Sequence, residues 1–237
     1  MCGIIGFKSK KFLDMKEVQG FLLQSKIRGQ HATGIAWVED KQLKYKIVPD
    51  PATDLEIPKI KTKLLIGHCR YSTSSLEYNQ PIVYDNMAVV HNGVISQADP
   101  KTWEKKYGLK CKGKNDSELI LRQMQRDEHP YDLGGSIACI VIDNSGKTPI
   151  LYWFRNEYRP LYHTYTNKYE PTGHGQFKDL GTKTFILAST KDIFKRMGYN
   201  DAELVQCLST NYTKLNKDIA ESWVNNIHVD DLQKHTV

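Results

Sequence analysis

The sequence predicts an α+β fold in which layered, mostly antiparallel sheets form a single domain. Short apolar segments with strand character are numerous, and many are joined by turn sequences that favour hairpins. Only a few segments repeat apolar residues at helical spacing. No repeat, linker or break in composition divides the 237 residues, so one domain over residues 2–237 is expected.

The N-terminal part is predicted to begin with a strand and a helix. Residues 2–7 are apolar and bounded by glycines, which is typical of a buried strand. Asp14 can cap a helix that ends at Arg28-Gly29, where a basic residue is followed by a glycine stop. Residues 35–38 and 43–47 flank a polar turn and predict a hairpin. The chain terminus is therefore expected to be held by a strand rather than frayed.

In the central part, two predicted strands end in polar residues. Residues 64–70 are apolar and lead into a polar stretch, and residues 87–90 form a second buried strand that runs into His91-Asn92-Gly93. A helix is predicted over residues 117–126, with Asp116 at its start. Polar side chains are thus expected to gather where these elements begin or end.

The last part continues the pattern of hairpins. Residues 162–182 have no clear period and are expected to form a surface excursion such as a long hairpin. Clear pattern ends near residue 198, so residues 199–237 are treated as a C-terminal extension. The other predicted elements are a hairpin of residues 137–143 and 150–154, a strand at 185–188 and a short helix within 189–198.

Composition and charge narrow the class of protein. The chain is 40% hydrophobic and 25% charged, which is typical of a folded globular protein rather than a disordered one. Its 33 Lys and Arg against 27 Asp and Glu give a formal charge of +6. The lysine clusters at residues 105–106 and 110–114 lack an aromatic-basic interleaved motif, so we expect a solvated or docking face there and no nucleic-acid partner.

The sequence also lacks the patterns typical of a membrane-spanning helix, a signal peptide or a metal site. No apolar run reaches the roughly 18–20 residues of a membrane-spanning helix, and lysines interrupt the N-terminus where a signal peptide is apolar. A cytoplasmic location without membrane association is expected. The five cysteines are widely spread and form no C-x-x-C pair, so neither a disulfide framework nor a zinc site is indicated. We expect no metal and no cofactor.

Cys2 is the strongest candidate for a catalytic residue. Aminopeptidases remove Met1 when the second residue is small, and Cys2 would then hold both a thiol and a free amine. The reference pKa values of these groups are about 8.5 and about 7.7–8.0, so a neutral amine is available to take the thiol proton. The alternative is that Cys2 is only a small apolar residue beside the start codon. Gly3 and the strand that follows favour catalysis, because they hold the terminus in place.

A series of motifs resembles the class II glutamine amidotransferases in the order in which that family carries them. The most specific match is Val90-His91-Asn92-Gly93, and an ordered series is far less expected by chance than one motif. The matches cover residues 2–198. The other segments that carry the resemblance are Cys2-Gly3-Ile4-Ile5-Gly6, Arg28-Gly29-Gln30-His31-Ala32-Thr33-Gly34-Ile35, Gly67-His68-Cys69-Arg70-Tyr71-Ser72-Thr73, Asn79-Gln80-Pro81 and Asn115-Asp116-Ser117-Glu118. Gly134-Gly135-Ser136, residues 155–162 and Leu187-Ala188-Ser189 fall where the family has its later strands.

The resemblance implies a fold and a reaction. The fold would be the four-layer αββα sandwich of the N-terminal-nucleophile (Ntn) hydrolases. Cys2 would attack the side-chain amide of L-glutamine, release ammonia and leave a thioester that water hydrolyses to glutamate. The side chain of Asn92 and the backbone N–H of Gly93 would form the oxyanion hole. For an isolated Asn-Gly pair, a simple hairpin turn would be the preferred interpretation.

The resemblance also implies a binding site for the zwitterionic end of glutamine. Arg70 would bind the carboxylate through its planar guanidinium, and Asp116 would bind the ammonium. The alternatives are a solvated strand-end charge for Arg70 and a helix N-cap for Asp116. Supporting positions are Ser72 and Thr73 as hydrogen-bonding groups, Tyr71 on the loop expected to close over glutamine, and Arg28 as a brace for the region of the active-site asparagine.

Several residues depart from the family pattern or offer other chemistry. Cys69 replaces a usual Thr and is expected to be buried, and the segment 155–161 is shorter than in the family. His31, His68 and His91 could suggest a Cys-His dyad or a metal cluster, but packed and hydrogen-bonded histidines are the preferred interpretation.

Three functional hypotheses follow. The leading one is a glutaminase that supplies ammonia to a separate synthase in trans, because the residues after the last motif leave no room for a synthase domain. The second keeps the Ntn fold with another γ-glutamyl or amide substrate. The third is a non-catalytic relative that binds glutamine or a partner protein. The sequence does not identify the acceptor, the pathway or the oligomeric state.

Overall fold

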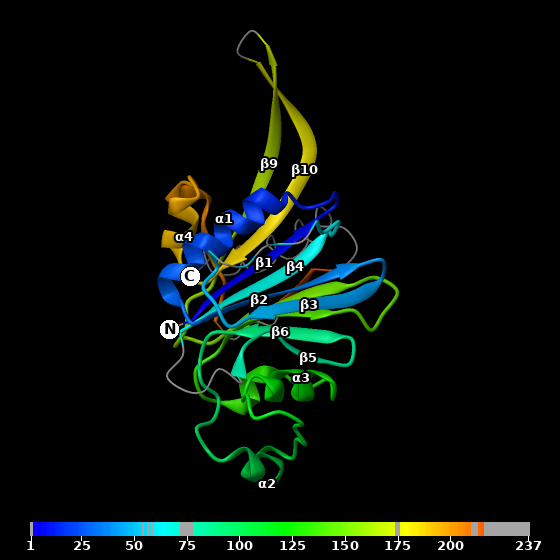
Figure 1. The fold of residues 1–237 in the computed structure, drawn as a ribbon, viewed down its shortest axis with the longest axis vertical. Coiled ribbons are helices and arrows are strands. Elements are labelled where there is room, and N and C mark those ends of the chain that lie inside the picture. The colour runs from blue at the N-terminus through cyan, green and yellow to red at the C-terminus, as the bar shows by residue number, and fades with distance from the viewer. Residues whose placement is uncertain are drawn as a thin grey trace, which may run out of the picture.

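Two antiparallel sheets lie face to face, and helices cover both outer faces (Figure 1). The computed structural model describes residues 2–53, 55, 57, 59–71, 78–173, 176–209 and 213–215, with side chains left out for 167–182 and 213. Within these residues, one sheet has seven strands in the order β11-β9-β10-β1-β4-β2-β3, and the other has five in the order β12-β8-β7-β6-β5. The predicted α+β class and the four layers are confirmed.

The elements follow the predicted order with small shifts at their ends. In the N-terminal half they are β1 (Gly3–Ser9), α1 (Met15–Ser25), β2 (Ala32–Glu39), β3 (Gln42–Val48), β4 (Leu64–Arg70), β5 (Ile82–Tyr84), β6 (Met87–His91) and α2 (Trp103–Tyr107). In the C-terminal half they are α3 (Glu118–Met124), β7 (Ala138–Asp143), β8 (Ile150–Arg155), β9 (Tyr162–Gly173), β10 (Gln176–Ala188), α4 (Lys191–Arg196), β11 (Val205–Gln206) and β12 (Thr213–Leu215).

Strand β1 lies in the middle of the molecule and is buried on both faces. Ile5 and Phe7 pack toward α1 and α4, whereas Ile4 packs toward the second sheet. This alternation is the two-residue period of a strand. Gly6 allows the second sheet to approach, because a Cβ there would meet the Ile140 side chain at 3.1 Å. A strand buried on both sides holds the start of the chain in place.

Helices α1 and α4 form the outer layer on the seven-stranded sheet (Figure 1). Asp14 caps α1 as predicted, because its side chain accepts a hydrogen bond from the Lys16 N–H. Phe21 on α1 packs edge-to-face against Phe7 on β1 and Phe194 on α4, at centroid distances of 5.3 and 5.4 Å. These aromatic contacts stabilise the packing of the two helices against the central strand.

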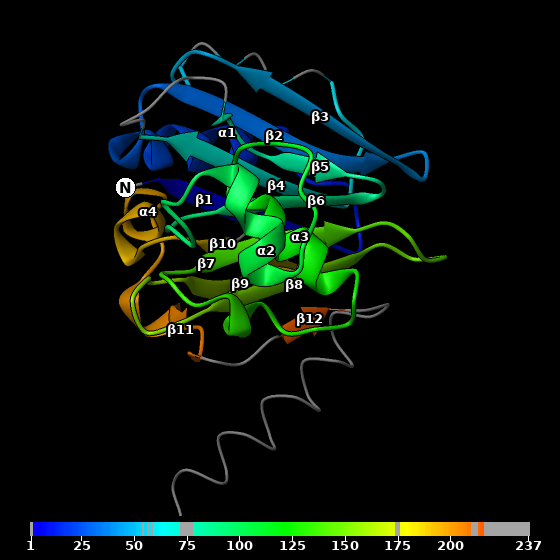
Figure 2. The same cartoon turned by 90° about the horizontal axis from the view of Figure 1, so that it is seen from below.

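Helix α3 and the segment containing α2 cover the outer face of the five-stranded sheet (Figure 2). Leu119 and Ile120 on α3 are fully buried there, and Trp103 on α2 is 2% exposed. Helix α2 was not predicted, because five residues are too few for a helical period to be recognised in the sequence.

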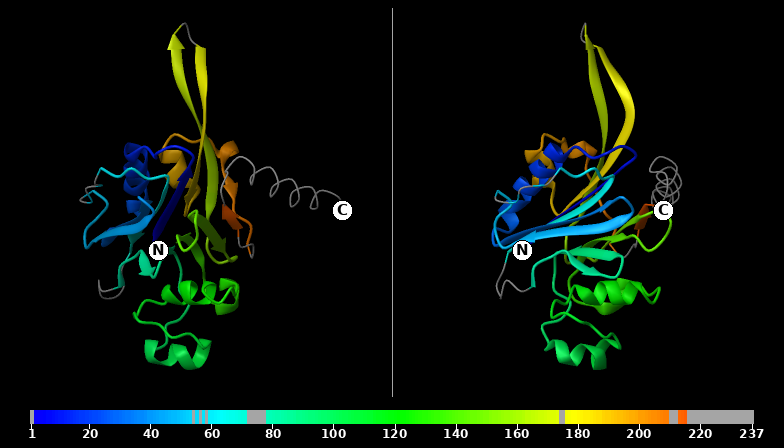
Figure 3. Two further views of the ribbon diagram at one scale, coloured as in Figure 1. Left: turned by 90° about the vertical axis from the view of Figure 1, so that its right-hand side faces the viewer. Right: turned by 45° about the vertical axis from the view of Figure 1, so that its right-hand side comes forward.

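The long hairpin of β9 and β10 confirms the prediction for residues 162–182. Its base belongs to the seven-stranded sheet, and the hairpin extends from there beyond the layers (Figures 1 and 3). Only the base of β10 pairs with β1, from Thr184 to Ala188. The predicted strand at 185–188 is this base.

The helices among the described residues are all too short or too polar to cross a membrane. The cytoplasmic location stays a prediction.

Candidate active site

Strand ends bring the predicted site residues to one end of the sandwich. Cys2 directly precedes β1, and Arg70 is the last residue of the antiparallel neighbour β4, in which Cys69 pairs with Gly3. Strand β6 of the second sheet ends at His91 and is followed by Asn92. Because antiparallel neighbours place the start of one strand beside the end of the other, residues far apart in the sequence meet here.

The backbone of Cys2 is held by two side chains, Asn92 after β6 and Arg28 after α1. Its N–H donates a hydrogen bond to Asn92 Oδ1 at 3.2 Å, and its carbonyl accepts one from Arg28 Nε at 3.1 Å. The Cys2 side chain is partly exposed. Gly3 is required by close packing, because a Cβ there would lie 2.8 Å from the Ser25 carbonyl oxygen. The structure therefore places Arg28 against Cys2 itself, on the 3-10 turn (Lys26–Arg28) that follows α1.

The Asn92-Gly93 turn presents two donors without partners in the described part of the chain. Asn92 is 2% exposed, and its Nδ2 is buried with no hydrogen-bond partner there. The Gly93 N–H likewise makes no bond among these residues. A side chain at Gly93 would collide with the Ser136 carbonyl. A buried donor left unpaired costs about 1–3 kcal/mol, so the turn is poised to bind an acceptor.

This turn is not the simple hairpin that an isolated Asn-Gly pair suggests. Asn92 exchanges backbone hydrogen bonds with Ala138, with N···O distances of 2.8 and 3.1 Å. Val94 then forms an isolated bridge with Ser136. The segment after β6 thus continues alongside the approach to β7 and does not turn back to pair with β6.

Arg70 is buried, in contrast to the solvated charge considered from sequence. It is 7% exposed, and its Nη1 donates to Asn79 Oδ1 at 2.7 Å. Burial lowers the pKa of the Arg70 guanidinium, and the nearby Cys2 thiol acts in the opposite direction. The segment before β2 packs tightly against it, since a Cβ at Gly29 would collide with the backbone of Cys69 and Arg70. A buried guanidinium at this end of the sandwich, close to Cys2, can bind a carboxylate as a planar fork.

Asp116 does not cap α3, and the helix-cap interpretation is wrong. Its Oδ2 accepts hydrogen bonds from the N–H groups of Ile95 and Ser96, at 2.6 and 3.1 Å. Asn115 bonds at the helix start instead, because its Oδ1 accepts from the Ser117 N–H at 2.9 Å. One carboxylate oxygen of Asp116 therefore holds the loop that follows Gly93, and no hydrogen bond to its Oδ1 is formed among the described residues.

Ser72 and Thr73 lie outside the described residues, so their predicted roles stay predictions. Tyr71 is 53% exposed, and its ring centroid lies 5.2 Å from that of His31. His31 is itself exposed, which contradicts the expectation of a packed residue.

The other two histidines are buried but differ in their contacts. His91 is hydrogen-bonded as expected, through Ser117 Oγ at 3.0 Å and the Ser136 carbonyl at 3.2 Å. For His68, neither ring nitrogen has a partner of good geometry within the described residues, and burial lowers its pKa to about 3. The described residues contain no group of three metal-ligating side chains.

The remaining cysteines have environments that disfavour the reactive thiolate. Burial raises the pKa of Cys69 and Cys139 to about 12, and that of Cys111 to about 11. Burial also raises the pKa of Cys207. A thiol with a raised pKa is a poor nucleophile near neutral pH, so these four cysteines are structural.

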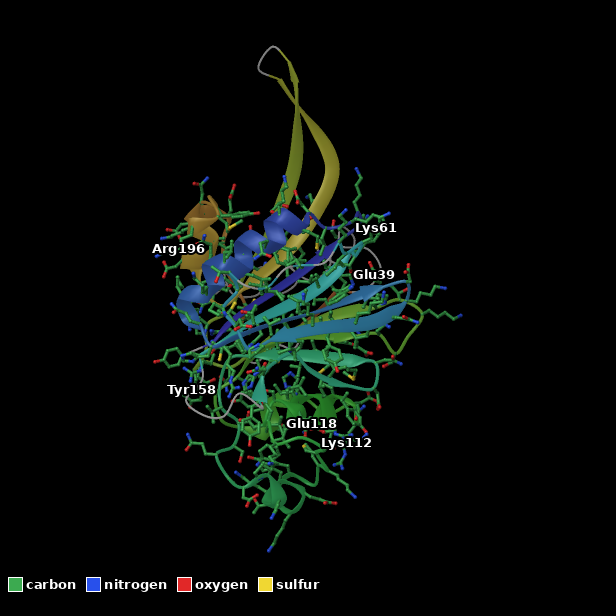
Figure 4. All side chains as sticks on the ribbon, viewed as in Figure 1. Glu39, Lys61, Lys112, Glu118, Tyr158 and Arg196 are labelled. Carbon is green, nitrogen blue, oxygen red and sulfur yellow. The ribbon has the colours of Figure 1, made fainter. Side chains whose placement is uncertain are left out.

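Sequence reasoning missed several polar residues around the turn. Gln80 is 7% exposed and bonds to both backbone groups of His91. Asn156 binds the Ile137 N–H and the Gly135 carbonyl, and it also accepts a bond from the N–H of Tyr158, which lies at the surface (Figure 4). Gln80 belongs to the Asn79-Gln80-Pro81 segment of the resemblance. Its hydrogen bonds to His91 and Ser117 depend on the packed structure and could not be recognised from that segment.

The chain is similar in sequence to a family of domains and to several enzymes. Residues 68–171 match the model of a glutamine amidotransferase domain. The chain is 33% identical over 131 residues to glutamine–fructose-6-phosphate aminotransferase (isomerizing) of Clostridium acetobutylicum, covering 51% of this chain and 21% of that protein. It is 30% identical over 158 residues to the enzyme of the same name from Buchnera aphidicola, covering 62% and 26%. The match therefore spans about a quarter of these relatives or less.

Two solved structures share the fold. One is a glutamine phosphoribosylpyrophosphate amidotransferase from B. subtilis, with a TM-score of 0.60 and 21% identity. The other is described as the allosteric regulatory enzyme of purine biosynthesis, with a TM-score of 0.61 and 20% identity. Each alignment covers 89% of this chain and 50% of the solved chain.

Proposed function

Because the chain carries a class II glutamine amidotransferase domain, we propose that it hydrolyses L-glutamine to glutamate and ammonia, with Cys2 as the nucleophile once Met1 is removed. One observation carries the proposal. The Asn92 amide accepts a bond from the Cys2 nitrogen through Oδ1, while its buried Nδ2 has no partner among the described residues. A single side chain thus links the nucleophile to an available oxyanion donor.

The reaction follows from these groups. The free amine of Cys2 takes the thiol proton, and Sγ attacks the carboxamide carbon of glutamine. The oxyanion that forms accepts hydrogen bonds from Asn92 Nδ2 and the Gly93 N–H. The protonated amine then gives its proton to the departing nitrogen, and ammonia leaves. Water, activated by the same amine, attacks the γ-glutamyl thioester and releases glutamate.

Substrate recognition is assigned to Arg70, which is buried close to Cys2, and to Asp116, which is partly buried. The Arg70 guanidinium binds the α-carboxylate of glutamine as a planar fork. The Oδ1 of Asp116 accepts a hydrogen bond from the α-ammonium, while its Oδ2 remains bound to Ile95 and Ser96. Ser72 and Thr73 add hydrogen bonds to the substrate in this proposal. The two groups together favour free glutamine, which carries an α-carboxylate and an α-ammonium, over an amide that lacks either charge.

The ammonia is proposed to pass to an acceptor enzyme in trans. Free ammonia is mostly protonated near neutral pH, and ammonium is not a nucleophile, so release into water would waste the product. The acceptor is identified by this chemistry alone: it binds an electrophilic substrate beside the Cys2 end of the sandwich. Adding the acceptor and its substrate is expected to raise the rate of glutamine hydrolysis. An unchanged rate with every co-purifying synthase would contradict this part of the proposal.

The hydrolysis itself is tested by replacing the nucleophile. Purified protein lacking Met1 is expected to convert glutamine to glutamate, and Cys2→Ala is expected to lower kcat by more than about 10³-fold. The matched control is Cys111→Ala, since Cys111 is a half-buried thiol with a raised pKa outside the site. Equal activity of wild type and Cys2→Ala would overturn the proposed function, and so would an inactive wild type whose Met1 has been removed.

A further inference from the structure

We propose that Gln80, His91, Ser117 and Ser136 form a hydrogen-bonded network that positions the Asn92-Gly93 turn for oxyanion binding. This inference deepens the proposed function and rests on it. The four residues come from four separate places: the approach to β5, the end of β6, the start of α3 and the approach to β7. They touch neither Cys2 nor the two oxyanion donors through their side-chain hydrogen bonds, so they act as positioning residues.

The network is buried and continuous. Ser117 is fully buried, His91 is 1% exposed and Gln80 is 7% exposed. Gln80 Nε2 lies 3.2 Å from Ser117 Oγ, and Ser117 Oγ lies 3.0 Å from His91 Nδ1. His91 Nε2 lies 3.2 Å from the carbonyl oxygen of Ser136. The Ser117 hydroxyl and the His91 ring therefore each have two hydrogen-bonding partners within the network.

The partners and the burial of His91 together favour one arrangement of protons. A carbonyl oxygen only accepts, so His91 Nε2 carries the proton that it donates to Ser136. The Gln80 amide nitrogen only donates, so Ser117 Oγ accepts from it. Burial lowers the pKa of His91 and thereby favours the neutral ring over an imidazolium. With the ring neutral, Nδ1 is unprotonated and accepts the proton of Ser117.

The network holds the turn from both sides. On one side, Gln80 clamps the His91 backbone, because its Oε1 accepts from the His91 N–H at 2.6 Å and its Nε2 donates to the His91 carbonyl at 3.2 Å. On the other side, the Val94 N–H donates to the Ser136 carbonyl at 3.0 Å and to Ser136 Oγ at 3.1 Å. Asn92 and Gly93 lie between these two clamps.

This arrangement explains how the two donors can stay without a partner among the described residues. Oxyanion donors assist catalysis when they are held in place before the reaction, so that no reorganisation is needed as charge develops. The clamps fix the backbone on either side of Asn92 and Gly93 without using their donors. Loss of a clamp is therefore expected to slow the chemical step more than it weakens glutamine binding.

The kinetic test compares two buried hydroxyl groups. Ser117→Ala breaks the network, and Thr62→Ala removes a hydroxyl that is 1% exposed and bonds to the Val38 and Leu64 backbone at the other end of the sandwich. Both variants are expected to lower the melting temperature by similar amounts. Only Ser117→Ala is expected to lower kcat for glutamine, by about tenfold, with KM changed less than about twofold. Ser117→Thr retains the hydroxyl and is expected to restore kcat.

A kcat for Ser117→Ala equal to that of wild type would overturn the network, and so would an equal loss in Thr62→Ala. If Ser117→Ala does not fold, Gln80→Glu keeps the side-chain size and removes the donor to Ser117, with the same expected fall in kcat. An inactive wild type would instead count against the proposed function.

A spectroscopic test is independent of activity. Nitrogen-15 NMR of wild type at pH 7, with His91 assigned by its loss in His91→Gln, is expected to show a neutral ring protonated at Nε2. The opposite tautomer or an imidazolium would overturn the network.

Discussion

The two ends of strand β1 differ in the pairing of a buried side-chain donor. At the Cys2 end, Asn92 Nδ2 is buried without a partner in the described part of the chain. At the other end, the buried ammonium of Lys8 donates to the carbonyls of Pro149 and Leu215, at 3.2 and 2.6 Å. The Thr62 hydroxyl nearby is also bonded. Satisfied groups hold the sandwich together, whereas the unpaired donor is kept for a ligand.

Charged groups show the same contrast. Near the far end, Glu39 pairs with Lys44 at 2.8 Å and accepts a bond from the Lys61 backbone at 2.9 Å; Figure 4 shows Glu39 and Lys61 close together there. At the Cys2 end, the buried Arg70 guanidinium donates to the neutral amide of Asn79 and interacts with the nearby Cys2 thiol. In the proposed function, the charges at the far end serve local structure and Arg70 serves substrate binding.

The largest effect expected from this comparison is that of Asn92→Ala. It removes one of two oxyanion donors, which typically costs about 2.7–4 kcal/mol, so kcat is expected to fall by about 10²–10³-fold. Asn144→Ala is the matched control, because its amide donates to the Lys41 carbonyl at the far end. Steady-state glutaminase kinetics check both variants. A similar loss in the control, or none in Asn92→Ala, would remove the distinction between the two ends.

A smaller effect is expected for Arg70→Lys. The lysine keeps the charge but loses the planar fork, so kcat/KM is expected to fall by about 10–100-fold, mainly through KM. Arg122→Lys is the control, since that guanidinium pairs with Glu118 at 3.1 Å and stacks on Tyr84 away from the site. It is expected to lower stability and leave KM unchanged. Equal KM values for Arg70→Lys and wild type would show that Arg70 does not bind the carboxylate.

The smallest effect on activity is expected for Lys8→Met. Burial lowers the pKa of Lys8 from its ordinary 10.5 to about 8, so the unfolded chain holds this proton more tightly than the folded protein. Stability should therefore rise with pH between about 8 and 10.5, and the part due to Lys8 should be about 3 kcal/mol. Below pH 8 both states carry the proton and this contribution is constant.

Urea unfolding of wild type and Lys8→Met over pH 7–10 measures this contribution as the difference between the two proteins. The gain with pH is expected in wild type and should be missing from the variant, while kcat at neutral pH stays unchanged in both. Parallel pH profiles would show that the Lys8 ammonium is not destabilised by burial. A loss of kcat would show that the far end contributes to the active site.

Apolar patterns located the strand ends at Cys2 and Asn92, but the meeting of these two residues was implied by the family resemblance and not by the pattern. The sequence placed Asp116 at a helix start, but a helix boundary is uncertain by a residue or two, and Asn115 bonds at the helix start instead. The network of Gln80 could not be predicted, because each of its contacts joins residues that are distant in sequence. Burial and pairing of polar atoms are properties of the packed structure, not of local pattern.

The assignment of Cys2 as the nucleophile of a glutamine site is tested most directly by a glutamine-like electrophile. 6-Diazo-5-oxonorleucine carries the same carboxylate and ammonium as glutamine, and a thiolate displaces nitrogen from it to form a stable thioether. Mass spectrometry of the treated protein is predicted to show one adduct, on Cys2 of a chain that has lost Met1, and excess glutamine should prevent it. An unmodified Cys2, or equal labelling of Cys111, would contradict the account.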